Sequence, residues 1–451
     1  MLQYINIIKH ASKFVWVYFI LLSCSSNDND PNLNNENKIE IDFIKTLGGT
    51  KNESAQSITR TTDGGYAILG HTQSMDNDVE NKTNESYDYW LLKFDSNNNL
   101  QWQKAYGGTD DDRGSDIIQT SDGGYAITGF SKSKNGDVAQ NAGASDFWVS
   151  KLNTSGAIIW QKSFGFSGAD NGISIIQTND NGFLLTGVLD VSASGGEGNS
   201  KSLLAKKHAG GDYWAIKIDA SGNKAWSRYY GGTFTDTPYD AIQTEDNGYI
   251  IIGSSDSNDV DISANKGSYD FWVIKISETG ALIWEKSFGG SEIDEARAIT
   301  KSNDGNYIIV GDTRSNDLDV STNKGAADVW MIKMSPNGNL IWEKSFGGTS
   351  FDVGRSIHKT LDGGFLISGS SRSANGDFNS NQGQNDALIL KIDASANLKW
   401  QKTIGGSDID FAYDTLQLDD DSIIVIGESG SSNHDILENK GFTDLLIIKL
   451  K

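Results

Sequence analysis

Acidic residues recur in this chain at a fixed distance from a repeated glycine. Carboxylate oxygens are the ligands that hard divalent cations prefer, so acids that converge on one axis could hold a metal ion and support hydrolysis. The same spacing suits a structural role, in which each acid accepts hydrogen bonds from the backbone of its own glycine turn. The seven acids, each five positions after its glycine, are Glu53, Asp112, Asp170, Asp236, Asp294, Asp352 and Asp410.

Two longer acidic segments resemble a calcium-binding loop. Each places oxygen-bearing side chains at positions 1, 3, 5, 7 and 12 of such a loop. Position 6 lacks the usual glycine, because Ala264 and Thr322 stand there, and the last ligand is Asp in place of Glu. An Asx-rich loop held by its own hydrogen bonds is therefore the alternative to calcium. The candidate ligands are Asp259, Asp261, Asn265, Asp270, Asp317, Asp319, Asn323 and Asp328.

Side chains that differ between matching positions are candidates for ligand contact, because a scaffold role would make them alike. After a second repeated glycine the chain has His71, Phe130, Val188, Ser254, Asp312, Ser370 and Glu428. A separate basic patch lies in an eight-residue insertion of the third copy. It contains Lys201, Lys206, Lys207 and His208.

Other common catalytic patterns are missing from the sequence. After the first 23 residues the four histidines lie in four different copies, and Cys24 is the single cysteine of the chain. No His-x-x-x-His pair, cysteine cluster or nucleophile elbow is present. A pair of carboxylates for hydrolysis stays open, because sixty acids offer many pairs.

The glycines that precede the acids reveal an internal repeat. Successive members lie 58 or 59 residues apart, except for one interval of 66 that contains the insertion. Such a period fixes the architecture before any single residue does. These glycines are Gly48, Gly107, Gly165, Gly231, Gly289, Gly347 and Gly405.

Each copy contains four short apolar runs bounded by Gly, Asn and Asp turns, which is typical of strands. In residues 294–347 the runs are 296–300, 307–311, 329–334 and 340–346. Four strands per unit and seven units predict an all-β fold, a seven-bladed β-propeller with four antiparallel strands per blade. The first-to-second and third-to-fourth turns are short, whereas the second-to-third loops are long, so we expect any binding site on the long-loop face.

The two ends of the repeat array complement each other. The last copy stops after its third strand, at residues 445–450, and a fourth strand is found at residues 39–47. There Phe43 and Lys45 occupy the positions of Trp284 and Lys286 in a complete copy. We therefore expect the N-terminal strand to join the last blade and close the ring, which leaves no exposed edge at the seam.

The chain is acidic, with 38 Lys and Arg against 60 Asp and Glu. Nucleic-acid binding requires a basic surface, so we expect no nucleic-acid partner. Residues 1–23 contain two lysines and no acid, and an apolar run too short to span a bilayer. We expect a signal peptide over residues 1–23, a polar tether over 24–38 and the propeller over 39–451.

Residues 21–24, Leu-Leu-Ser-Cys, resemble the lipobox of bacterial lipoproteins. The resemblance implies acylation of Cys24, for example by palmitate, and two or more acyl chains make a stable membrane anchor. The Ser- and Asp-rich segment that follows is similar to the surface-export signal of Bacteroidetes lipoproteins. The whole chain resembles the β-propeller repeat lipoproteins of that group, which implies a surface-exposed outer-membrane protein.

From these features we expect a monomeric, lipid-anchored binding or scaffold protein of the cell envelope, with a glycan, peptide or protein as partner. Calcium is the one cofactor that the sequence suggests. The alternative is a metal-dependent hydrolase, for example one acting on glycans, that uses the acids around the channel. The sequence favours binding over catalysis without deciding between them.

Overall fold

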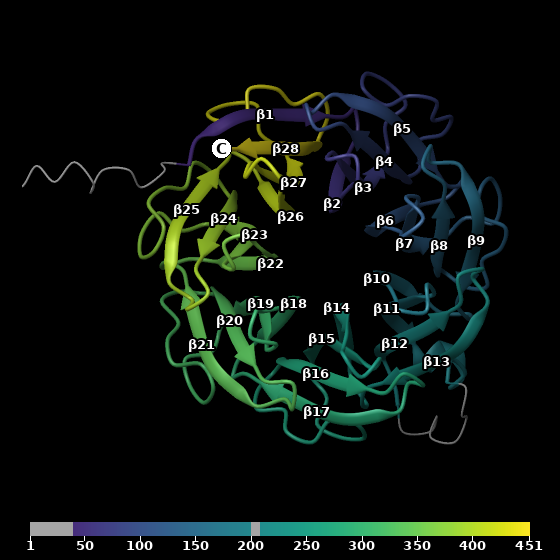
Figure 1. Cartoon of the computed structure of the whole chain (residues 1–451), viewed down its shortest axis with the longest axis vertical. Coiled ribbons are helices and arrows are strands. Elements are labelled where there is room, and N and C mark those ends of the chain that lie inside the picture. The colour runs from purple at the N-terminus through teal and green to yellow at the C-terminus, as the bar shows by residue number, and fades with distance from the viewer. Residues whose placement is uncertain (1–38, 200–207) are drawn as a thin grey trace, which may run out of the picture. The chain divides into compact units, whose positions relative to one another are not determined.

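The computed structural model describes residues 39–199 and 208–451. The leader, Cys24, the tether to residue 38, Lys206 and Lys207 lie outside the described residues. Residues Glu40 to Lys451 form one unit of seven four-stranded sheets arranged as blades around a ring (Figure 1). All pairs within the sheets are antiparallel, so the predicted seven-bladed propeller is confirmed.

The innermost strand of each blade faces the centre of the ring, and the second strand lies directly outside it. The innermost strands are β2 (Glu53–Arg60), β6 (Asp112–Gln119), β10 (Asn171–Gln177), β14 (Asp236–Gln243), β18 (Asp294–Lys301), β22 (Asp352–Lys359) and β26 (Asp410–Gln417). The second strands are β3 (Tyr66–Thr72), β7 (Tyr125–Ser131), β11 (Phe183–Asp190), β15 (Tyr249–Ser255), β19 (Tyr307–Thr313), β23 (Phe365–Ser371) and β27 (Ile423–Ser429).

The third strands are buried along nearly their whole length, whereas the outer strands are partly exposed. The third strands are β4 (Asp88–Phe94), β8 (Asp146–Leu152), β12 (Gly211–Ile218), β16 (Asp270–Ile276), β20 (Asp328–Met334), β24 (Asp386–Ile392) and β28 (Asp444–Leu450). The outer strands are β5 (Leu100–Tyr106), β9 (Ile158–Phe164), β13 (Lys224–Tyr230), β17 (Leu282–Phe288), β21 (Leu340–Phe346), β25 (Leu398–Ile404) and β1 (Ile41–Leu47).

A single short helix, α1 (Val191–Ser194), interrupts the described strands and is capped by the Asp190 side chain. Within residues 39–199 and 208–451, no helix has the length and apolar content needed to cross a bilayer.

Aromatic pairs join the first five blades in succession. Tyr213 in β12 packs in a tilted arrangement against Trp272 in β16, with ring centroids 4.5 Å apart, and its hydroxyl donates to the Trp272 carbonyl at 3.0 Å. Phe271 repeats the ring contact with Trp330 at 4.6 Å. Such pairs add to the burial energy of the rings. The third-strand tryptophans are therefore packed between neighbouring blades.

The N-terminal strand closes the ring as predicted. β1 pairs with β28 from Phe43, opposite Lys449, to Leu47, opposite Leu445 (Figure 1). Phe43 packs against a core cluster that contains residues of the first and last blades. Strands separated by about four hundred residues in the sequence thus share one sheet.

Strand boundaries differ slightly from the apolar runs. In the blade of residues 294–346 the strand predicted to end at Gly311 continues to Thr313. Gly311 stands inside this strand because a Cβ there would lie 1.9 Å from the Glu295 carbonyl oxygen of β18. Close approach of two backbones, not a left-handed conformation, explains the repeated glycine.

Candidate functional site

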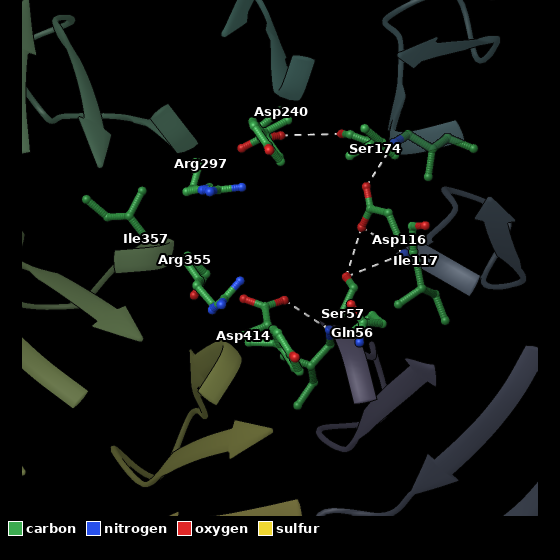
Figure 2. Close-up of a pocket in the computed structure, with 18 of the residues that line it drawn as sticks. Gln56, Ser57, Asp116, Ile117, Ser174, Asp240, Arg297, Arg355, Ile357 and Asp414 are labelled. Carbon is green, nitrogen blue, oxygen red and sulfur yellow. Dashed lines mark hydrogen bonds between the residues drawn. The ribbon is translucent and has the colours of Figure 1, made fainter. Parts of the chain in front are cut away.

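A cavity of about 550 Å³ lies at the centre of the ring (Figure 2). Residues from all seven innermost strands line it. Because the backbone of these strands repeats, the side chains at matching positions decide what the cavity can bind. Its volume falls within the usual range for small-ligand sites.

Each innermost strand contains a β-bulge that directs one extra side chain toward this cavity. In β18 the register with β19 shifts between Ala296 and Ala298, which leaves Arg297 unpaired. Bulges re-aim side chains and are frequent beside functional sites. We call the seven bulged residues, all of which line the cavity, the bulge ring: Gln56, Ser115, Ile173, Tyr239, Arg297, Arg355 and Tyr413.

The position after the bulge holds small or acidic side chains that connect neighbouring blades. Three of them are aspartates, and each accepts a hydrogen bond from a backbone N–H of the next blade. Asp240 also accepts from the N–H of Ala241 in its own strand at 2.7 Å, so its two oxygens are engaged in backbone contacts. The bonds between blades run from Ile175 N to Asp116 (2.8 Å), from Ile299 N to Asp240 (3.0 Å) and from Ile58 N to Asp414 (3.0 Å).

Asp414 is buried and Asp116 and Asp240 are half-buried, and the loss of water around them disfavours their charged form. Burial raises the pKa of Asp116 to about 6 and that of Asp240 to about 7, although backbone N–H groups oppose the shift. Burial would lower the pKa of His358, but the Asp414 carboxylate, 2.7 Å from Nε2, outweighs it and raises that pKa.

Two arginines from neighbouring blades give one side of the bulge ring a positive charge. Figure 2 shows the Arg297 and Arg355 guanidinium groups directed into the channel. Arg297 lies over the Tyr239 ring, with Cζ 4.3 Å from the centroid, and donates to Glu295 at 2.9 Å. Arg355 lies over the Tyr413 ring at 5.0 Å. Stacking on an aromatic face holds a guanidinium group while its edge remains available to a ligand.

Two of the residues predicted for ligand contact lie beside the bulge ring. Asp312 is 2% exposed, and its Oδ1 is 3.9 Å from Nε of Arg297. Glu428 accepts a hydrogen bond from the Tyr413 hydroxyl at 2.9 Å. These two residues therefore belong to the second layer behind the cavity lining.

Two further predicted contacts, His71 and Phe130, occupy the same position in the first and second blades and, like Asp312 and Glu428, do not line the cavity. His71 packs edge-on against Tyr87, and burial, together with Arg113, lowers its pKa to about 3. It is therefore neutral at physiological pH. Phe130 is half-buried and pairs with Arg113 across the sheet.

The basic insertion is described only at its end. His208 is buried, and its Nδ1 lies 2.6 Å from Oδ2 of Asp212. Its ring packs edge-on against Tyr229 at 4.9 Å. His208 thus contacts the third blade itself and is not an exposed member of a basic patch.

Each member of the predicted acidic ring caps its own glycine turn. All seven are buried, and none lines the cavity. This geometry matches the structural interpretation of the repeat and gives no support to the hydrolase alternative, which required several of these acids in one pocket. The bonds run from Gly49 N to Glu53 (2.7 Å), Gly108 N to Asp112 (2.8 Å), Phe166 N to Asp170 (2.7 Å), Gly232 N to Asp236 (2.7 Å), Gly290 N to Asp294 (2.7 Å), Gly348 N to Asp352 (2.8 Å) and Gly406 N to Asp410 (2.7 Å).

The candidate calcium ligands are hydrogen-bonded within the long-loop face. Asp259 accepts from the Thr233 N–H at 3.0 Å, Asp261 from the Gly231 N–H at 3.3 Å and Asp270 from the Lys266 N–H at 2.8 Å. Asn265 donates to the Ser255 and Ser257 carbonyls at 3.1 Å each. The described ranges 39–199 and 208–451 contain no group of three or more His, Cys, Asp or Glu placed to hold a metal ion.

The second such loop has the same arrangement. Asp317 accepts from Ser291 N at 2.8 Å, Asp319 from Gly289 N at 3.2 Å and Asp328 from Lys324 N at 2.9 Å. Asn323 accepts from Gly325 N at 3.0 Å. The regular spacing of these acids is therefore explained by turns that join neighbouring blades.

Sequence reasoning missed the bulge ring. Its members stand three positions after each acid of the acidic ring, where the copies have Gln, Ser, Ile, Tyr, Arg, Arg and Tyr. Comparison of the seven copies at this position would have shown the variation. The bulge itself is not visible in the sequence, because apolar alternation alone does not reveal the extra residue.

No family model matches the chain, and no curated protein matches it. Among solved structures it is similar to a protein of unknown function from Bacteroides caccae, with 12% identity over 63% of this chain and 80% of that one and a TM-score of 0.35. It is also similar to the WD40 domain of Pan2 from Neurospora crassa (10% identity, 91% and 95% coverage, TM-score 0.46). A gluconolactonase from Xanthomonas campestris gives 8% identity, 90% and 89% coverage and a TM-score of 0.37. None of these similarities bears on ligand or activity.

Aspartates at the start of the third strands make the stability of the fold depend on pH. In Asp270, Oδ2 accepts from Lys266 N, whereas the buried Oδ1 has no hydrogen-bond partner. Burial raises the pKa of Asp270 to about 7, and the nearby Asp294 carboxylate adds to the shift. Burial likewise raises the pKa of Asp88 to about 7 and that of Asp444 to about 6.

We expect the melting temperature to be higher at about pH 5.5 than at about pH 8. The folded chain keeps protons on these acids that the unfolded chain has released, so stability falls as the pH rises through about 4 to 7. Despite partial burial, hydrogen bonds lower the pKa of Asp63 to about 2, so it titrates below this window. Circular dichroism melts provide the measurement. Asp270→Asn should melt about 3 °C or more above the unmodified chain at pH 8 and show a smaller pH dependence. A melting temperature that decreases steadily on acidification to pH 5.5 would contradict this explanation.

Proposed function

We propose that this chain is a lipid-anchored cell-envelope protein whose propeller binds a ligand in the central cavity, entered from the long-loop face. The bulge ring carries the proposal. Around it the same backbone and the same turn contacts recur in every blade, yet the seven cavity-lining side chains differ in charge, size and aromatic character. A purely structural position would favour one residue type, whereas contact with an asymmetric ligand favours such variation.

Binding suits these residues better than hydrolysis. The carboxylates that line the cavity are engaged in hydrogen bonds between blades. A general acid or base must instead reach the reacting group. The acidic ring is likewise occupied by its turns. The groups that remain for a ligand are guanidinium, phenol and amide groups, which can bind a ligand and fix its orientation.

The long-loop face offers further contact for a larger partner such as a glycan, peptide or protein. Leu318 and Phe234 expose 69% and 61% of their surface there. Leu318 and Val260 have φ angles of +55° and +58°, whereas matching loops have Asn77, His434 or a glycine. Strained backbone held by its surroundings is a feature of binding sites. We propose that a monomer presents this face to its partner, with neither nucleic acid nor calcium required.

The cavity can be blocked without changing the rest of the ring. Ser115→Trp would place an indole in the bulge ring, so we expect it to weaken binding to any glycan or peptide that the full-length chain captures on an array, by about tenfold or more. Ser221→Trp, in the tight turn between β12 and β13, is the matched control and should bind as the unmodified chain does. Equal binding by both variants would exclude the cavity as the site.

We also propose that Cys24 anchors the protein in the outer membrane, with the propeller on the cell surface. The lipobox-like residues 21–24 and the polar segment that follows support this proposal. In cells fed labelled palmitate, we expect the unmodified chain to acquire the label and fractionate with membranes, and Cys24→Ser to do neither. Labelled Cys24→Ser protein would refute acylation at this residue.

A further inference from the structure

Arginines are concentrated in one sector of this acidic protein. The chain has seven arginines and a formal net charge of −22. Four of these arginines lie in the fifth and sixth blades, which begin with β18 and β22. They are Arg297, Arg314, Arg355 and Arg372. Two belong to the bulge ring, and the other two flank the exposed Phe351 ring on the long-loop face, with Cζ 5.8 and 5.7 Å from its centroid.

Three buried polar atoms in this sector have no hydrogen-bond partner among the described residues. They are Nε of Arg297, Nε of Arg355 and Oδ1 of Asp312. Buried polar atoms in folded proteins are nearly always satisfied by protein, water or a ligand. Nε of Arg297 and Oδ1 of Asp312 lie 3.9 Å apart and form an ion pair, whereas Nε of Arg355 has no acceptor in the described part of the chain and is free to donate to a water molecule or a ligand.

Arg355 is the most open of the arginines toward a ligand. Within the described part of the chain, no carboxylate oxygen lies within 4.0 Å of its guanidinium nitrogens. Its face is covered by Tyr413 at 5.0 Å and Phe411 at 5.2 Å. A guanidinium group held by its face presents its N–H edge, which fits the two oxygens of a planar oxyanion.

The local balance of charge indicates what kind of anion fits. Three arginines, Arg297, Arg314 and Arg355, act electrostatically on Asp312, as does the Glu295 carboxylate. Arg297 is engaged by Glu295 and lies 3.9 Å from Asp312, whereas no carboxylate of the described residues pairs with Arg355, so one guanidinium group on this side of the cavity is unpaired. The next acid, Glu428, is engaged by the Tyr413 hydroxyl. A single positive charge on a planar guanidinium group, whose two N–H donors match two coplanar oxygens, favours a carboxylate over a doubly charged phosphate.

We infer that Arg355, assisted by Arg297, binds the carboxylate group of the ligand that enters the central cavity. The inference rests on the proposed function, because it assigns a chemical class to that same site. Tyr413 and Tyr239 hold the two bulge-ring arginines by their faces, and the aspartates that line the cavity accept hydrogen bonds from backbone N–H groups, which engage their negative charge. The carboxylate could belong to a sugar acid or to the end of a peptide, and both sources share the same contact.

The test is a titration of the full-length chain by calorimetry with four probes. Sodium D-glucuronate and N-acetylglycine represent the two sources of a carboxylate, inorganic phosphate represents another anion, and D-glucose is the uncharged control. We expect one or both carboxylates to bind saturably, and the tighter of the two to identify the source. Glucose should bind at least about tenfold more weakly than glucuronate, since a charge-assisted hydrogen bond is lost.

Variants assign the contact to Arg355. We expect Arg355→Met to weaken carboxylate binding by about tenfold or more and Arg355→Lys to have an intermediate effect, because lysine keeps the charge and loses the fork. Arg228→Met removes the same charge from the outer strand β13 and should change nothing. Melting temperatures identify a variant that has lost the fold. If Arg355→Met does not fold, the carboxylate affinity of Arg355→Lys decides whether Arg355 makes the contact.

Three results would overturn the inference: carboxylate affinity unchanged in both Arg355 variants, phosphate bound more tightly than either carboxylate, or saturable binding of neither carboxylate. Each of these results leaves the proposed function intact as long as Ser115→Trp still weakens binding to the glycans or peptides that the unmodified chain captures on the array. Loss of the effect of Ser115→Trp would instead refute the cavity as the binding site. The two failures are therefore distinguishable.

Discussion

The antiparallel pairing of β1 with β28 is the constraint on which the other features of this molecule depend. It joins the first described strand to the last and makes seven sheets into a ring. Only in a closed ring do the seven innermost strands surround one space, and only then does Asp414 of the last blade reach the N–H of Ile58 in the first. The cavity, the bulge ring and the separation of two faces all follow from this closure. Closure also removes the free sheet edges that an open array would expose.

Charge in this protein is used mainly to hold backbone. The acids of the acidic ring cap their turns, the loop aspartates bind N–H groups of the crossings, and the cavity aspartates link neighbouring blades. Buried carboxylates in such roles lose the solvation of their charged form, which explains their raised pKa values. Against this background Arg355 is exceptional, because it stacks on aromatic rings and pairs with no carboxylate of the described residues. The contrast separates the structural charges from those available to a ligand.

Much of the fold could be predicted from the sequence, because the repeat supplies seven copies of each local signal. The strands, their turns and the closure by residues 39–47 follow from apolar runs and from the match of Phe43 and Lys45 to a complete copy. The site could not be predicted in the same way. Asp259 and Asp317 resemble metal ligands because the spacing of a turn that binds backbone N–H groups overlaps that of a calcium loop. Arg355 was overlooked because its role depends on a bulge and on stacking against another blade, neither of which has a sequence signature.

The closure of the ring is most directly tested by deleting residues 39–47 and measuring thermal unfolding. Loss of β1 exposes the edge of β28 and removes Phe43 and Leu47 from the core shared by the first and last blades. We expect the melting temperature to fall by at least about 5 °C, corresponding to a loss of a few kcal/mol or more. Deletion of residues 25–38, which leaves β1 intact, is the control and should not change the melting temperature. If both deletions melt at the temperature of the unmodified chain, β1 does not close the ring and the single central cavity has no basis.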